Sequence, residues 1–199
     1  MSHYFLDDKN LISEIKTFNI SINNVIFTFN TDNGVFSKGE LDFGTNALIK
    51  NVLNLDIKGD VLDLGCGYGP IGIVIKKLKP VNVTMSDVNS RAVHLSKMNA
   101  KKNNVLVNVV NSDGYENIND SFDYIISNPP IRVGKKKLYE LLINSKNHLK
   151  NNGELLIVVR REQGALSLIK DMSVYYNVKV IDKVKGFFII SLKNDWLLF

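Results

Sequence analysis

The chain has little of the chemistry that builds disulfide frameworks or metal clusters. Cys66 is its only cysteine among 199 residues, which excludes an internal disulfide and a cysteine-based metal cluster. The three histidines, His3, His94 and His148, are scattered without the spacing of metal ligands. We therefore expect a protein without a metal ion that works in a reducing, cytoplasmic compartment.

Long apolar runs are absent as well. No stretch approaches the roughly 18 apolar residues that a membrane-spanning helix requires. The first eight residues lack the basic start and apolar core of a signal peptide. With 45% hydrophobic and 23% charged residues, the composition is that of an ordinary globular protein. We expect no membrane partner, and a monomer or a small homo-oligomer.

Arginine is scarce, because 21 of the 25 basic residues are lysines. The net charge of +5 favours polyanionic partners without requiring one. Since lysine and asparagine are abundant throughout, the lysines carry little information by themselves. The arginines are more informative, and three of the four follow predicted strands: Arg132, Arg160 and Arg161.

The first forty residues are the least regular part of the chain. Apolar residues alternate at period two around Asn23-Asn24, which predicts a β-hairpin. Thr45 is predicted to cap a helix that runs to about Leu55. We therefore assign residues 1–45 to an N-terminal hairpin extension and residues 46–199 to one compact main domain.

From residue 60 onward, short apolar strands alternate with helical patterns. This alternation predicts a doubly wound α/β fold with a mostly parallel sheet of seven strands. The last two strands are separated by only four residues, so they form an antiparallel hairpin. The predicted strands are 61–64, 81–86, 105–110, 122–127, 153–159, 175–182 and 187–192, and the predicted helices are 71–79, 90–102, 136–149 and one ending near 172.

A glycine-rich loop follows the first of these strands, in the sequence Asp63-Leu64-Gly65-Cys66-Gly67-Tyr68-Gly69. Such glycines let the backbone approach a ligand closely and leave the N–H groups of the next helix accessible. Asp87 follows the second strand, 22 residues after Gly65, where an acid can hold ribose hydroxyls. The dinucleotide-binding fingerprint requires a small residue at position 70. Pro70 stands there, which disfavours a nicotinamide or flavin enzyme.

The loop resembles motif I of the class I S-adenosylmethionine-dependent methyltransferases, and the resemblance extends from about residue 59 to residue 192. It implies S-adenosyl-L-methionine as the cofactor. In that family the acid before the glycines lies near the methionine end of the cofactor, the acid after strand two holds the ribose, and the acid after strand three lies near the adenine amine. Taken alone, the third acid could equally be a solvated turn residue. The cofactor-binding residues implied are Asp63, Gly65, Cys66, Gly67, Asp87, Val88, Asp113 and Asn128.

The stretch Ser127-Asn128-Pro129-Pro130-Ile131 follows the fourth strand and resembles motif IV of the amino-methylating members of this superfamily. An exocyclic base amine is a poor nucleophile because its lone pair is delocalised into the ring. Two acceptors facing its N–H groups would orient the nitrogen toward the methyl group. We predict that Asn128 and the carbonyl of Pro129 are these catalytic acceptors. Neither proline contributes a competing donor.

The identity of the substrate depends on other segments. The residues Gly34-Val35-Phe36-Ser37 and the following Asp42-Phe43-Gly44-Thr45 resemble an element of the ribosomal RNA small-subunit methyltransferase C family, and His3-Tyr4-Phe5 resembles its opening. This likeness is closest to a short, single-domain branch. It implies methylation of a guanine N2 amine, with ribosomal RNA or the small ribosomal subunit as partner. A base could stack against Phe36 or Tyr68, since Ile131 replaces the aromatic residue that is usual in motif IV.

Positive charge is predicted beside Asn128, where Arg132 and three successive lysines follow. These groups suit phosphate contacts around a target base, although Lys136 and Lys137 could simply be a solvated helix start. The substrate-binding residues predicted are Phe36, Pro130, Ile131, Arg132 and Lys135. The alternatives are a protein-glutamine N5 or adenine N6 methyltransferase, or a non-catalytic RNA-binding assembly factor. The apolar tail Trp196-Leu197-Leu198-Phe199 is expected to pack on its own domain.

Overall fold

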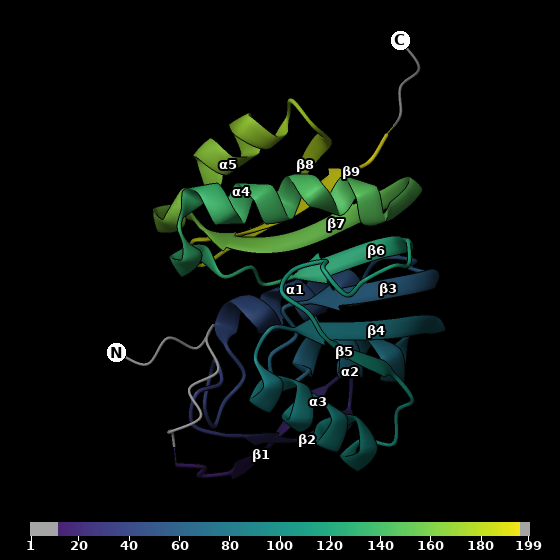
Figure 1. Ribbon diagram of the computed structural model, residues 1–199, viewed down its shortest axis with the longest axis vertical. Helices are drawn as coiled ribbons and strands as arrows, with labels where there is room; N and C mark the ends of the chain where they lie inside the picture. Colours follow the sequence, from purple (N-terminus) through teal and green to yellow (C-terminus); the bar gives the residue numbers. More distant parts are fainter. Residues whose placement is uncertain (1–11, 196–199) are drawn as a thin grey trace.

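The computed structural model describes residues 12–195, and in it a central seven-stranded sheet organises the chain (Figure 1). The strand order is β5-β4-β3-β6-β7-β9-β8, with β3 to β7 parallel and β9 antiparallel to both of its neighbours. This confirms the predicted doubly wound sheet with its antiparallel end. The strands are β3 (Gly59–Leu64), β4 (Val81–Asp87), β5 (Asn108–Asn111), β6 (Phe122–Ser127), β7 (Leu149–Arg160), β8 (Asn177–Val184) and β9 (Phe187–Lys193).

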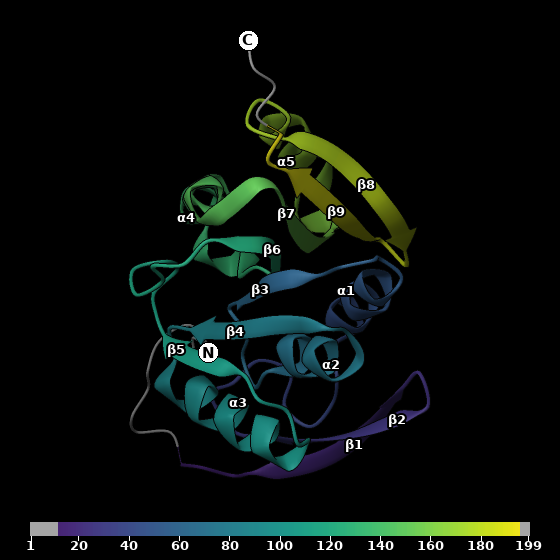
Figure 2. The same cartoon turned by 90° about the vertical axis from the view of Figure 1, so that its right-hand side faces the viewer.

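Helices cover both faces of this sheet and bury two hydrophobic clusters (Figure 2). The first cluster lies under α1 (Phe43–Leu53), α2 (Pro70–Leu78) and α3 (Ser90–Lys102). The second lies under α4 (Lys135–Asn144) and α5 (Ala165–Met172). Three short 3₁₀ turns complete the chain between these elements: η1 (Ile131–Val133), η2 (Ser145–His148) and η3 (Arg161–Gln163).

The predicted N-terminal hairpin is formed by β1 (Lys16–Ile22) and β2 (Val25–Thr31). Asn23 and Asn24 connect the strands with φ of 49° and 61°, the left-handed conformation that a two-residue hairpin turn requires and that asparagine tolerates. The inner side chains of the hairpin, among them Phe27 and Phe29, join the first hydrophobic cluster. The hairpin is therefore an additional layer outside α2 and α3.

Asn99 of α3 and Asn103, the residue that caps its C-terminus, hold the free edge of β2. They lie four residues apart, and so on one face of the helix. Asn99 accepts from the Asn30 N–H at 2.8 Å and donates to its carbonyl at 2.9 Å. Asn103 does the same with Thr28, at 3.0 and 2.8 Å. These side-chain amides satisfy backbone groups that a further strand would otherwise pair.

Several predicted boundaries were wrong. α1 begins at Phe43 and is capped by Asp42, not by Thr45, because the Asp42 carboxylate accepts from the Thr45 N–H at 2.9 Å. β5 begins at Asn108, since Val105 still hydrogen bonds to the end of α3. The helix expected to reach residue 149 ends at Asn144, so β7 starts four residues earlier than predicted. His3-Tyr4-Phe5 and the tail Trp196-Leu197-Leu198-Phe199 lie outside the described residues.

Candidate active site and cofactor loop

Four predicted site residues lie where parallel strands end. Asp63 is the second-to-last residue of β3, Asp87 ends β4, Asp113 follows β5 and Asn128 follows β6. These four strands are neighbours in the order β5-β4-β3-β6, so their carboxyl ends form one continuous edge. Ligands of doubly wound sheets bind at this edge, which makes it the candidate site.

The glycine loop between β3 and α2 leaves space beside this edge. Gly65 and Gly67 have φ of 70° and 57°, and a side chain at either position would meet no atom within 4 Å. Gly69 is different, because a side chain there would press on Ile73 and Ser96. The first two glycines therefore face open space suited to a ligand, whereas the third permits close helix packing.

Asp63 is fully buried between the sheet and the start of α2. Its Oδ2 accepts from the Gly72 N–H at 2.8 Å, while its Oδ1 has no hydrogen-bond partner among the described residues. The pKa of Asp63 is raised to about 7, mainly by burial and to a smaller extent by the charge of Asp87. The hydrogen bond from Gly72 opposes this shift only in part. A buried acceptor without a donor is a position that a donor of a bound ligand can satisfy.

Asp87 connects the glycine loop to the end of β4. Its carboxylate accepts from the N–H groups of Gly67 and Asn89, at 2.8 and 2.9 Å. The next side chain, Val88, is 38% exposed, which leaves an apolar surface beside the acid. Asn111, at the end of β5, donates to the carbonyls of both Asp87 and Val88. The ends of β4 and β5 are thus fixed together around this carboxylate.

Asp113 lies further out in the turn after β5 and is exposed. Its carboxylate is 3.2 Å from the Lys137 Nζ at the start of α4. The neighbouring Ser112 is buried and bonds the turn to β4 through its N–H and the Asp87 carbonyl. Asp113 therefore lies at the same edge as Asp87 but also has a cationic partner.

Asn128 has a defined orientation. Its Nδ2 donates to the Thr45 hydroxyl at 3.0 Å and to the Asp42 carboxylate at 3.3 Å, both at the N-terminus of α1. With the NH₂ group used in this way, the Oδ1 atom remains as an acceptor. No hydrogen bond within residues 12–195 is made to this oxygen or to the carbonyl of Pro129. Two successive residues after β6 therefore each keep an acceptor without a donor in the described part of the chain.

Asp42 and Thr45 were not predicted to be parts of this corner. They precede Asn128 by more than 80 residues in the chain, so nothing in local spacing relates them. The available signal was chemical, since an acid directly before a helix that also carries a hydroxyl at its third residue can hold an amide donor. Their capping role alone would not require Thr45 to be 5% exposed and turned toward β6.

The predicted substrate-binding residues are placed unevenly around Asn128. Phe36 is 46% exposed, whereas Ile131 packs on the second hydrophobic cluster. Lys135 lies 3.1 Å from the Asp171 carboxylate and over the Tyr139 ring, so its ammonium group has partners on α5 and α4. Pro130 is the residue before η1, and Arg132 is within η1; the Arg132 side chain is not among the described groups.

Tyr68 and Cys66, both in the glycine loop, are core residues. Tyr68 is 2% exposed and edge-on to Phe18 and Phe29, so it offers no free ring face for stacking. Cys66 is buried, and burial raises the pKa of its thiol well above the ordinary value, which keeps it protonated. Across residues 12–195 no group of three metal-binding side chains occurs, and no helix is long and apolar enough to cross a bilayer.

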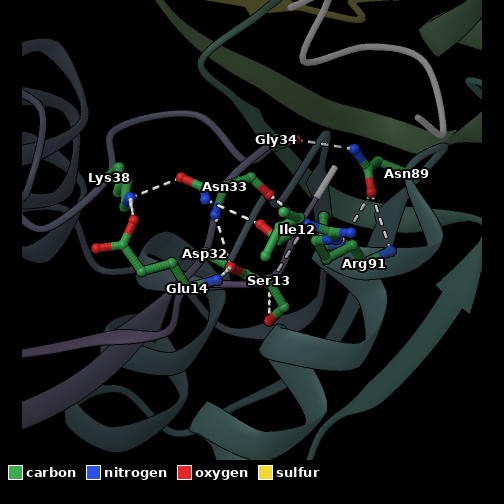
Figure 3. A network of polar contacts seen from close by, with 10 residues as sticks. Ile12, Ser13, Glu14, Asp32, Asn33, Gly34, Lys38, Asn89 and Arg91 are labelled. Carbon is green, nitrogen blue, oxygen red and sulfur yellow. Dashed lines mark hydrogen bonds and ion pairs between the residues drawn. The ribbon is translucent and has the colours of Figure 1, made fainter. Parts of the chain in front are cut away.

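A polar network ties the N-terminal segment to the start of α3 (Figure 3). Asp32 is buried and accepts from Ser13 and Glu14, with the Arg91 guanidinium 3.5 Å away. Burial would raise the pKa of Asp32, but the hydrogen bonds and Arg91 together hold it below its ordinary value. Asn89, two residues after Asp87, donates to the Gly34 carbonyl at 3.1 Å. The loop that carries Phe36 is thereby fixed beside the glycine loop and Asp87.

Comparison with known proteins gives this site a family. Residues 26–191 match the model of the methyltransferase small domain. The chain belongs to this methyltransferase family. Over 197 residues it is 41% identical to YbxB of Bacillus subtilis, an uncharacterized protein, with 96% of the chain and 98% of YbxB covered.

Two relatives named as ribosomal RNA methyltransferases are longer than this chain. Ribosomal RNA small subunit methyltransferase C of Haemophilus ducreyi is 43% identical over 129 residues, or 62% of the chain and 39% of that protein. Its namesake in Haemophilus influenzae strain PittGG is 39% identical over 167 residues, or 81% of the chain and 49% of that protein. The chain therefore spans about two fifths to one half of the length of these relatives.

Solved structures share the fold. The T. thermophilus 16S rRNA N2 methyltransferase RsmC, solved with AdoMet and guanosine, superposes with a TM-score of 0.81 at 21% identity, over 90% of the chain and 50% of that protein. A methyltransferase from Pyrococcus furiosus gives a TM-score of 0.67, also at 21% identity, over 76% of the chain and 83% of that protein. The seven-stranded sheet with its antiparallel end is the class I methyltransferase fold.

Proposed function

We propose that this protein transfers a methyl group from S-adenosyl-L-methionine to the exocyclic N2 amine of a guanine in small-subunit ribosomal RNA. The observation that carries the proposal is the orientation of Asn128. Because Asp42 and Thr45 hold its NH₂ group, its oxygen is left as an acceptor, and the next residue, Pro129, adds a free carbonyl at the sheet edge that also holds the open glycines. Such a pair of acceptors suits a primary amine and has no evident structural purpose.

The residues around the glycine loop fit S-adenosyl-L-methionine. The space over Gly65 and Gly67 admits a ligand against the backbone. The unpartnered Oδ1 of Asp63 suits the cationic amino group at the methionine end of the cofactor. Asp87 lies where ribose hydroxyls can donate to its carboxylate, with Val88 as an apolar surface for the adenine. Asp113 completes the edge and can accept from the adenine amine. When bound, this cofactor supplies an electrophilic methyl group on a sulfonium.

The protein's own contribution is positioning. Asn128 Oδ1 and the Pro129 carbonyl accept from the two N–H groups of the guanine amine, which draws the nitrogen lone pair out of conjugation with the ring. Asp42 and Thr45 keep the Asn128 amide from rotating and presenting its NH₂ group to the substrate, where a donor would repel the amine. No strong base is needed in the attacking step, because the methylated nitrogen can release its extra proton to water afterwards. That no histidine of residues 12–195 contacts Asn128 is consistent with this reaction.

Two observations favour RNA as the substrate: the similarity to ribosomal RNA small subunit methyltransferases C and the net charge of +5. A paired guanine would have to be unstacked before its amine reached Asn128, whereas a loop guanine would be accessible directly. Phe36, being exposed beside the cofactor loop, suits stacking on the extruded base. Action on ribosomal RNA would place the protein in the cytoplasm, with the small subunit or its RNA as partner.

A labelled-transfer experiment tests this proposal. The protein is incubated with S-adenosyl-L-methionine carrying a labelled methyl group and, separately, with ribosomal RNA, intact small subunits and an RNase-treated protein extract. We expect label in RNA or subunits and none in the extract. Label in protein would replace the proposal by a glutamine methyltransferase that uses the same acceptor corner. Absence of cofactor binding in calorimetry would replace it by a non-catalytic RNA-binding protein.

A further inference from the structure

A cluster of aromatic rings and cations lies at the end of β7 and the turn between β8 and β9. Arg160 is the last residue of β7, and its guanidinium lies 5.2 Å from the centre of the Phe187 ring. The Lys185 ammonium lies 5.1 Å from the Phe43 ring. The two rings are 5.4 Å apart and tilted by 44°. We call these four residues, Phe43, Arg160, Lys185 and Phe187, the basic aromatic cluster.

The basic aromatic cluster adjoins the acceptor corner. A side chain at Gly44 would come within 2.8 Å of the Phe187 ring, so the first turn of α1 is in close contact with that ring. The next residue, Thr45, holds the Asn128 amide at 3.0 Å. β7 also runs parallel to β6 with Ser127 beside Ile157, so Arg160 projects beyond the same edge as Asn128. Figure 2 shows the β8–β9 turn beside α1.

The charges of the basic aromatic cluster differ from those that sequence analysis emphasised. Lys135 and Lys137 each have a carboxylate within 3.2 Å, Asp171 and Asp113 respectively. Lys185 has no carboxylate within 4 Å in the described part of the chain, and Arg160 has only Glu162 at 3.7 Å, in an exposed pair. Phosphates would therefore meet less competition at the basic aromatic cluster than at the start of α4.

One ring of the basic aromatic cluster, Phe43, suits an unpaired base, whereas Phe187 is half-buried against the first hydrophobic cluster. Phe43 is 37% exposed although it begins a helix whose other apolar side chains are mostly buried. Exposed aromatic faces flanked by cations are the combination with which proteins bind single-stranded nucleic acid, since every base can stack and every phosphate can pair. Guanidinium and ammonium groups held over rings are also already positioned for such contacts.

We propose that the basic aromatic cluster binds RNA next to the target guanine, with Lys185 and Arg160 on phosphates and Phe43 stacked on an adjacent unpaired base. This inference rests on the proposed function and adds to it the direction in which the RNA leaves the acceptor corner. The strand would pass from Asn128 over the N-terminus of α1 toward the β8–β9 turn, away from α4 and α5.

The test compares two lysines of one hairpin. Lys185→Gln removes a charge of the basic aromatic cluster, whereas Lys183→Gln removes an exposed charge that lies over Phe188, a ring of the second hydrophobic cluster on the other face of the sheet. Binding of purified 16S ribosomal RNA is measured from about 50 to 200 mM salt, and the KM for RNA in methyl transfer is measured alongside. Affinity for S-adenosyl-L-methionine serves as the folding control.

We expect Lys185→Gln to weaken RNA binding by about three- to tenfold and to reduce the salt slope by about one, with Lys183→Gln unchanged. Phe43→Leu should weaken binding by about tenfold without changing the salt slope, because it removes stacking and not charge. If the two lysine variants weaken RNA binding equally, or not at all, the proposed role of the basic aromatic cluster is wrong. The proposed function still stands in that case, provided that the wild-type protein methylates RNA. Wild-type protein that methylates only protein would overturn both.

Discussion

β3 carries an aspartate near each end, and the two have opposite chemical environments. Asp60, at the amino edge of the sheet, lies 2.7 Å from the Lys150 ammonium, which also binds Asp123 at 2.8 Å. The hydrogen bonds from Lys150 and Asn82 hold the pKa of Asp60 below its ordinary value. Asp63, three residues later, is buried with one unpartnered oxygen, and burial raises its pKa to about 7. Both oxygens of the Asp60 carboxylate accept hydrogen bonds from neighbouring side chains, whereas one oxygen of the Asp63 carboxylate accepts none.

A second pair of polar arrangements, one at each edge, differs in the same way. At the amino edge the Asp60 N–H and the Lys150 ammonium both bind the Asp123 carboxylate, which is a self-contained structural arrangement. At the carboxyl edge, Gly65 and Gly67 face open space, and the acceptors of Asn128 and Pro129 have no donor among the described residues. A buried unsatisfied group costs stability, so the free oxygen of Asp63 beside the open glycines supports a ligand at the carboxyl edge. The predictions below alter one edge at a time.

Asn128→Ala at the carboxyl edge should have the largest effect. It removes one of the two acceptors for the reacting amine, so kcat for methyl transfer should fall by about 10²–10³-fold. The affinity for S-adenosyl-L-methionine, measured by calorimetry, should change by less than about threefold. Near-normal turnover in this variant would mean that the stretch after β6 is only a turn.

Asp63→Asn should change how stability depends on pH. The folded protein keeps a proton on Asp63 up to about pH 7, whereas the unfolded chain releases it near the ordinary carboxyl pKa. Folded protein thus binds more protons between about pH 4 and pH 7, and its free energy of unfolding should fall as pH rises through this window. Without cofactor, the variant should lack this pH dependence. At pH 8 its free energy of unfolding should exceed that of the wild type by about a few kcal/mol. Denaturant unfolding at pH 5 and pH 8 measures it, and parallel pH profiles would refute the burial argument.

Asp87→Ala should act on the cofactor before it acts on the reaction. It removes a charged acceptor that we assign to the ribose, so affinity for S-adenosyl-L-methionine should fall by about 10- to 100-fold. At saturating cofactor, most of the turnover should return. Calorimetry that finds unchanged affinity would remove the ribose assignment, with Asn128→Ala as the matched variant of the same edge.

Thr45→Val tests the positioning of Asn128 without touching the substrate. The valine keeps the shape of the buried side chain but cannot accept from the Asn128 amide. We expect kcat to fall by about tenfold with an unchanged KM, because the amide oxygen is then less well aimed. Thr45→Ser retains the hydroxyl and should restore turnover. A loss that serine fails to restore would indicate a packing defect in α1 instead.

Lys150→Gln, at the amino edge, should have the smallest effect. The lysine and its two aspartates are partly exposed, and ion pairs of this kind contribute little to stability. The melting temperature should fall by no more than about a few degrees, and the rate of methyl transfer should change by less than about twofold. A large loss of activity would mean that the amino edge participates in function, and the contrast between the edges would fail.

The sequence predicted those parts of the site that parallel topology alone brings together. Asp63, Asp87, Asp113 and Asn128 lie at or just after the carboxyl ends of successive strands, so any doubly wound sheet places them at one edge. The partners of these groups were beyond prediction because they depend on how distant elements dock. The Asp42 and Thr45 contacts to Asn128, and the ion pair of Lys135 with Asp171, join segments that no periodicity relates. The domain boundary at residue 45 stays a prediction, although the N-terminal segment contributes to both hydrophobic packing and the acceptor corner.

The most direct test of the account is the chemical identity of the methylated product. Small-subunit ribosomal RNA is incubated with S-adenosyl-L-methionine and either wild-type protein or Asn128→Ala, then digested to nucleosides and analysed by mass spectrometry. The account predicts N2-methylguanosine with wild type and almost none with the variant. Methylated adenosine, or equal amounts of N2-methylguanosine from both proteins, would contradict it.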